Sequence, residues 1–184
     1  MVEEGSEMTG WRFFLTGVPG SGKSTAFMRC VERLRMLEFI VGGISTPEIR
    51  SRGRRVGFSV VDLASGRRAL LAGVDVTSGF RVGRYGVDVS GFESVALPAL
   101  DYAEGSCDVV CVDEIGRMEL FSEGFKRRIE ELMRGSKPMV SVLHRDCTKM
   151  YGRFGALLSV TPETRDEIPE LVVSGLKGYL KRKD

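Results

Sequence analysis

One eight-residue stretch near the N-terminus limits the possible folds of this chain more than any other feature. Residues 17–24 read GVPGSGKS, which satisfies the pattern G-x-x-x-x-G-K-[ST] at every constrained position. The apolar run 11–16 precedes it, and residues 25–37 follow with apolar side chains at helical spacing. A strand, a glycine-rich loop and a helix in this order form the setting in which such a loop holds phosphates. The motif therefore predicts a P-loop that binds a nucleotide.

Each constrained position of this loop has a chemical reason. The glycines allow positive backbone torsions and close approach, so successive N–H groups can face phosphate oxygens at a helix N-terminus. We expect Lys23 to reach the β and γ phosphates and the Ser24 hydroxyl to coordinate Mg²⁺. A chance glycine-rich turn with a solvent-facing lysine is the alternative. The predicted nucleotide-binding residues are Gly17, Val18, Pro19, Gly20, Ser21, Gly22, Lys23, Ser24 and Thr25.

Two adjacent carboxylates supply a second part of a nucleotide site. Asp113 and Glu114 follow the apolar run 107–112, which is typical of a strand covered on both faces. We expect Asp113 to bind Mg²⁺ together with Ser24. We expect Glu114 to orient or deprotonate a water for in-line attack on the γ phosphate, with Lys23 and Glu114 as the catalytic residues. The alternative is an Asp-Glu pair that merely ends a strand in a polar loop.

Phosphoryl transfer also needs positive charge beyond Lys23 in the transition state. Arg81 and Arg84 lie in the glycine-punctuated segment 77–85, which could fold over a bound nucleotide, so we treat them as candidate transition-state arginines. Most surface arginines are simply solvated, and that alternative applies to each candidate. The competing arginines are Arg50, Arg52, Arg54 and Arg55 in one cluster, and Arg117, Arg145 and Arg165 elsewhere.

Three other polar features have ordinary structural interpretations. His144 ends a predicted strand on the ligand-binding side and could sense the γ phosphate, although a hydrogen-bonded structural histidine is the more common role. A contact between Glu48 and Arg50 is a sufficient structural reason for both. The basic residues 181–183 are interpreted as the solvated C-terminus of a helix.

The first half of the chain contains further strand signals. Residues 40–45 and 56–63 are rich in β-branched side chains and are expected to form strands of a ribbon. A basic, glycine-containing connection over residues 50–55 precedes the second of them, and residues 64–67 form a turn.

The second half alternates between helix and strand signals. The expected elements are a helix capped by Ser90 with Pro98 in its interior, a helix from Ser122 to about residue 133, a buried strand over 139–143, and a final helix opened by Thr164 or Asp166. Alternation of this kind predicts an α/β fold with a largely parallel sheet. We therefore predict a P-loop NTPase fold, a RecA/AAA-like three-layer sandwich with a mostly parallel central sheet, helices on both faces and a β-ribbon insertion.

Composition narrows the classes of protein further. The chain has 184 residues, which we interpret as one domain over 1–184 with 1–10 as a flexible N-terminal extension. A formal charge of +2 predicts no nucleic-acid partner. The absence of a C-x-x-C pair and the presence of one histidine argue against zinc. No signal peptide or membrane-spanning run is evident, so we expect a cytoplasmic protein, with a monomer favoured although no feature identifies the oligomeric state.

The order of motifs resembles that of the small P-loop nucleoside-triphosphatases first characterised from thermophiles and also described as cancer-related nucleoside-triphosphatases. The segments that carry the resemblance cover residues 43–50, 53–58, 79–85, 92–100, 112–120 and 160–166. The chain departs from the family pattern at Ile44, Phe80 and Thr164, where phenylalanine, proline and asparagine are usual. The first two are interpreted as local packing changes, while Thr164 puts any polar role at its position in doubt.

This resemblance implies an activity and a second binding stretch. The implied activity is slow, Mg²⁺-dependent hydrolysis of ATP, GTP, CTP, UTP and TTP to diphosphate and phosphate. The implied second nucleotide-contacting stretch is Val109, Val110, Cys111, Val112, Asp113, Glu114, Ile115 and Gly116. Two other functions remain open at this point. One is a kinase that passes the γ phosphate to a nucleoside or another small acceptor, and the other is a nucleotide-dependent switch or nucleic-acid-associated module.

Overall fold

The computed structural model describes residues 11–180 of the chain. The predicted N-terminal extension 1–10 and the basic residues 181–183 lie outside the described residues. Among the described residues, no helix is long and apolar enough to cross a membrane.

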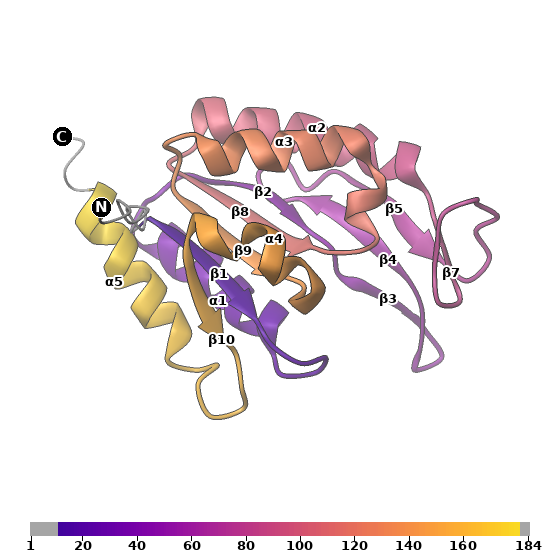
Figure 1. Cartoon of the computed structure of the whole chain (residues 1–184), viewed down its shortest axis with the longest axis horizontal. Coiled ribbons are helices and arrows are strands. Elements are labelled where there is room, and N and C mark those ends of the chain that lie inside the picture. The colour runs from indigo at the N-terminus through magenta and orange to yellow at the C-terminus, as the bar shows by residue number, and fades with distance from the viewer. Residues whose placement is uncertain (1–10, 181–184) are drawn as a thin grey trace, which may run out of the picture.

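A five-stranded parallel sheet forms the centre of the molecule (Figure 1). Each neighbouring pair in the order β10-β1-β9-β8-β2 runs parallel. Because helices cover both faces of this sheet, its four strands other than β10 are almost continuously buried, whereas β10 at the edge is partly exposed. The strands are β1 (Arg12–Thr16), β2 (Val41–Ser45), β8 (Val109–Ile115), β9 (Met139–Leu143) and β10 (Ala156–Ser159).

An antiparallel extension continues the same sheet beyond β2 in the order β4-β5-β7-β6. It contains β4 (Arg54–Asp62), β5 (Arg68–Gly73), β6 (Arg81–Val82) and β7 (Tyr85–Val87), while β3 (Glu48–Ser51) pairs with β4 alone. The predicted ribbon therefore exists, with one correction. Residues 40–45 were assigned to it, but β2 belongs to the parallel core and meets β4 only at Ile44 and Ser45.

Four long helices complete the three layers. Helices α2 (Val89–Ser106) and α3 (Glu123–Arg134) cover one face, and α1 (Lys23–Met36) and α5 (Ile168–Leu180) cover the other (Figure 1). Strand β8 contributes to both cores, because alternate side chains of a strand point to opposite faces. Val110 and Val112 pack in the α2–α3 core, whereas Val109 and Cys111 pack in the α1–α5 core. The predicted fold class is confirmed.

The helix starts follow local capping chemistry, with two corrections. Ser122 caps α3 as predicted, since its Oγ accepts a hydrogen bond from Phe125 N at 2.9 Å. The predicted cap of α2 is wrong, because Asp88, two residues before Ser90, accepts from the Gly91 N–H at 2.9 Å. The last helix begins at Ile168, after a turn, rather than at either predicted residue.

Two further features of the second half can be compared with the sequence prediction, of which the first agrees with it and the second differs in detail. Pro98 lies within α2, which continues past it to Ser106. The predicted strand 107–112 begins two residues later, because Cys107 ends α2 and the strand starts at Val109. A short helix α4 (Thr148–Tyr151), flanked by 3-10 turns, leads from β9 to β10.

Candidate functional site

The polar candidates gather at the carboxyl edge of the parallel strands. Residues 17–22 follow β1, the Asp-Glu pair ends β8, His144 follows β9, and residues 160–167 follow β10. Parallel α/β sheets bind ligands at this edge. The predicted P-loop, which joins β1 to α1, lies there in Figure 1.

The P-loop has the backbone that the motif predicts. Gly17, Gly20 and Gly22 have φ values of 154°, 79° and 95°, and Gly22 is the N-cap of α1. The Lys23 ammonium donates to the carbonyl oxygens of Gly17 at 3.1 Å and Val18 at 3.0 Å. The lysine side chain therefore turns back over the loop, where its charge faces any group that the loop holds.

Asp113 connects the two predicted motifs. Asp113 is 5% exposed, and the Ser24 side chain lies close enough to favour the charged form of its carboxyl group. Burial, the largest cause, raises the pKa of Asp113 to about 7, and the negative charge of Glu114 acts in the same direction. The neighbouring Ser24 side chain and the charge of Lys23 oppose this rise. The structure thus brings together the hydroxyl and the carboxylate that were assigned to Mg²⁺.

Glu114 lies beside the same group of charges. Burial, the largest cause, raises the pKa of its carboxyl group, while the neighbouring His144 and the Lys23 ammonium lower it. The peptide bond between Asp113 and Glu114 is cis. A Cβ atom added at Gly116 would lie 2.5 Å from Glu114 Oε1, so the absence of a side chain there leaves room for this carboxylate.

A third carboxylate, Glu119, was not predicted as a site residue. Glu119 is 3% exposed, and its Oε2 would lie 3.1 Å from a Cβ added at Gly116, the same position that meets Glu114. Burial, the largest cause, and the negative charge of Glu114 raise the pKa of Glu119 well above its usual range. The backbone N–H groups of Glu119 and Gly116 act in the opposite direction. The turn after Gly116 brings the two carboxylates together, and the strand pattern carries no signal of that turn.

The two predicted transition-state arginines hydrogen-bond within the antiparallel extension. Arg81 donates to the carbonyl oxygen of Arg84 at 3.0 Å, and Arg84 donates to the carbonyl oxygen of Arg55 and to the Tyr85 hydroxyl. Arg81 and Arg117, which follows the Asp-Glu pair in sequence, line the same cavity of about 360 Å³. Both predicted arginines therefore stabilise a hairpin at the far edge of the sheet.

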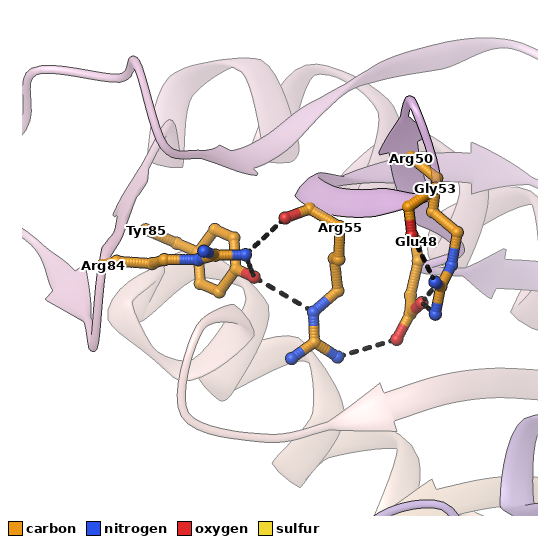
Figure 2. A network of polar contacts seen from close by, with 6 residues as sticks. All are labelled: Glu48, Arg50, Gly53, Arg55, Arg84 and Tyr85. Atoms are coloured by element: carbon orange, nitrogen blue, oxygen red, sulfur yellow. Dashed lines mark hydrogen bonds and ion pairs between the residues drawn. The ribbon is translucent and has the colours of Figure 1, made fainter.

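The cluster of arginines near β3 and β4 forms a polar network around Arg55 (Figure 2). Glu48 accepts hydrogen bonds from Arg50 and from Arg55, each at 2.7 Å, so the predicted contact between Glu48 and Arg50 is confirmed. Arg55 also donates to the Tyr85 hydroxyl at 3.0 Å. Arg55 and Arg84 lower the pKa of Tyr85, and Arg55 is the main cause that lowers the pKa of Glu48. The network joins three strands of the extension.

The remaining candidates occupy different surroundings. His144 Nδ1 accepts a hydrogen bond from Asp146 N at 3.2 Å, which is the structural role foreseen for it. Arg117 forms an ion pair with Asp146. Arg165, one of the competing arginines, lies against Gly22 of the P-loop.

The three-layer fold and the junction of P-loop and carboxylates define a P-loop nucleotide-binding protein. Residues 12–173 match the family model described as NTPase, and the chain belongs to this family. The predicted family resemblance is confirmed by relatives of nearly the same length. Nucleoside-triphosphatase THEP1 of Methanocaldococcus jannaschii is 34% identical over 92% of this chain and 99% of its own length. The THEP1 of Pyrococcus abyssi is 37% identical over 94% of this chain and 96% of its own.

Solved structures agree with this assignment. The crystal structure of THEP1 from Aquifex aeolicus superimposes with a TM-score of 0.80 at 33% identity, covering 90% of this chain and 98% of that one. The solution structure of a human cancer-related nucleoside triphosphatase superimposes with a TM-score of 0.77 at 32% identity, covering 91% and 97%.

Proposed function

We propose that this protein is a Mg²⁺-dependent nucleoside-triphosphatase that cleaves the γ-phosphate anhydride of ATP, GTP, CTP, UTP and TTP. Residues 17–25 and 109–116 contact the nucleotide. One observation supports this function most directly. The Ser24 hydroxyl, which ends the P-loop, lies beside the buried Asp113, and the Lys23 ammonium lies near enough to Asp113 and Glu114 to favour their charged forms.

The residues at this position fit a magnesium ion. Ser24 and Asp113 supply hard oxygen donors, which Mg²⁺ prefers. The Asp113 carboxylate is 5% exposed, and its raised pKa reflects the incomplete compensation of a buried negative charge, which a divalent cation would complete. Ser24 and Asp113 would hold the ion, and Mg²⁺ would then neutralise charge on the β and γ phosphates.

The other side chains perform the transfer to water. The loop N–H groups and Lys23 hold the phosphates and balance their charge. Glu114 takes a proton from a water molecule as the water oxygen bonds to the γ phosphorus. The bond between the γ phosphorus and the bridging oxygen breaks, which releases nucleoside diphosphate and phosphate. The raised pKa of Glu114 makes its carboxylate a better proton acceptor than an ordinary glutamate.

Slow turnover is consistent with the positions of Arg81 and Arg84. An arginine that stabilises the transferring phosphoryl group contributes a factor of about 10³ to 10⁵ in rate. Both candidates instead donate hydrogen bonds to backbone carbonyls of the extension. While these hydrogen bonds hold Arg81 and Arg84 in the extension, turnover depends on Lys23, Mg²⁺ and the base.

A phosphate-release assay tests this function. Eight nucleoside and deoxynucleoside triphosphates are each incubated with the protein, with and without Mg²⁺, and no phosphate acceptor is added. We expect release from all eight with Mg²⁺ and none after chelation. Turnover that appears only when a nucleoside is added would replace hydrolysis with a kinase activity. A rate that rises severalfold with RNA or DNA would favour a nucleic-acid-associated switch.

A further inference from the structure

The segment that follows β10 lies against the P-loop. Val160 N donates to the carbonyl oxygen of Thr16 at 2.7 Å, just before the loop begins. A Cβ atom added at Gly17 would lie 2.5 Å from the carbonyl oxygen of Val160. The chain therefore leaves β10 in close contact with the first residue of the P-loop.

Two threonine hydroxyls fix the turn that comes next. Thr164 Oγ1 donates to the carbonyl oxygen of Ser159 at 2.9 Å and accepts from Thr161 N at 3.0 Å. Thr161 Oγ1 accepts from Thr164 N at 3.2 Å, and Arg165 N donates to the Thr161 carbonyl oxygen at 3.0 Å. Thr164 thus has a polar role in shaping this turn, and the turn sets the direction of Arg165.

Arg165 lies directly over Gly22. A Cβ atom added at Gly22 would lie 3.0 Å from Arg165 Cδ and 3.7 Å from its Nη1. The arginine side chain is 47% exposed, and its contact with the Asp166 carboxylate is long, at 3.9 Å. Asp166 pairs more closely with Arg29 of α1. The guanidinium is consequently positioned at the P-loop and accessible to a ligand.

The order of the strands gives the direction in which a bound nucleotide runs. The P-loop follows β1, and Asp113 and Glu114 end β8, which lies beyond β9 on one side of β1. Arg165 follows β10, which lies on the opposite side of β1. A triphosphate whose γ phosphate faces Glu114 therefore has its nucleoside end toward Arg165.

We propose that the Arg165 guanidinium is the surface on which the nucleobase stacks, an inference that rests on the proposed function of the P-loop. A planar guanidinium packs on the face of any aromatic ring, and every base presents such a face. Stacking reads no base edge. The same residue therefore binds purine and pyrimidine nucleotides, which accounts for broad use of triphosphates.

Equilibrium binding in Mg²⁺ tests this role without relying on turnover. The ligands are the β,γ-imido analogues of ATP, GTP and UTP and inorganic tripolyphosphate, which lacks a base. The variants are R165A, R165K, which keeps the charge but loses the plane, and R134A, an exposed arginine of α3 paired with Glu130, as the matched control.

We expect R165A and R165K each to weaken binding of all three nucleotide analogues about tenfold and to leave tripolyphosphate binding unchanged. R134A should match the wild type. Equal weakening of tripolyphosphate binding would assign Arg165 to the phosphates, and wild-type affinity in R165K would show that charge alone matters. Either result overturns the proposal, as does an R165A variant with normal affinities. A wild-type protein that binds none of the four ligands would instead contradict the proposed function itself.

Discussion

Asp113 and Ser24 lie side by side in the folded protein, although they belong to separate motifs of the chain. The residue types at these positions are predictable because a P-loop motif demands a hydroxyl and the end of a buried strand supplies a carboxylate. Glu119 was not predictable as part of the site, since its proximity to Glu114 depends on a turn around Gly116. Arg165 was noted in the sequence, but its place over Gly22 depends on which strand lies next to β1.

The first prediction concerns a single residue, Lys23. Its ammonium lies on the carbonyl oxygens of Gly17 and Val18, where it would face the β and γ phosphates. We expect K23A to weaken triphosphate binding at least tenfold and to abolish measurable phosphate release, because the loop loses its only side-chain charge. K126A, on the surface of α3, is the control and should match the wild type. K23A with wild-type affinity and rate would contradict the role.

A substitution at Gly43 is expected to lower the stability of the protein. It has φ of 114° in β2, and an added Cβ would lie 2.0 Å from the carbonyl oxygen of Cys111 in β8. Backbone strain and overpacking act together here, so we expect G43A to lower the free energy of unfolding by about 3 kcal/mol or more in urea denaturation. G105A, whose added Cβ would meet nothing within 4 Å, is the control. Equal stability of the two variants would show that the strands can separate at little cost.

Among the elements, those with a strong apolar period were predictable and those without one were not. Strand β9 was predicted with its observed bounds, and α1 and α3 to within a few residues, because buried residues and a cap mark them. Strands β5 and β10 were not predicted. In β10 half-buried and exposed residues alternate over only four positions, and β6 has only two residues, so neither gives a usable pattern.

The start of α2 offers a direct test of local capping chemistry. Asp88 accepts the hydrogen bond from Gly91 N, whereas Ser90 lies inside the first turn. We expect D88A to lower the free energy of unfolding by about 1 kcal/mol, the usual cost of losing an N-cap, and S90A to change it by much less. Urea denaturation of both variants measures the difference. A larger loss in S90A than in D88A would reverse the assignment of the cap.

At the scale of the whole molecule, the fold class followed from the alternation of helices and strands, but the order of strands did not. The sheet places β9 between the P-loop strand and the carboxylate strand, and β10 on the other side. Sequence gives the strands in chain order only, so this arrangement had to come from the structure. This order of strands puts Glu114 on one side of the P-loop strand and Arg165 on the other. We assign the first side to the γ phosphate of a bound nucleotide and the second to its nucleoside.

We propose that the protein binds a nucleoside triphosphate at its P-loop and uses Glu114 to pass the γ phosphate to water. E114Q keeps the size of the side chain and removes its ability to take a proton. Phosphate release from Mg²⁺-ATP, measured beside the binding of a non-hydrolysable analogue, separates the two functions, with E123Q on the exposed start of α3 as the control. We predict that E114Q binds the analogue as the wild type does and releases phosphate about 10² to 10⁴ times more slowly. Wild-type release by E114Q would contradict the account.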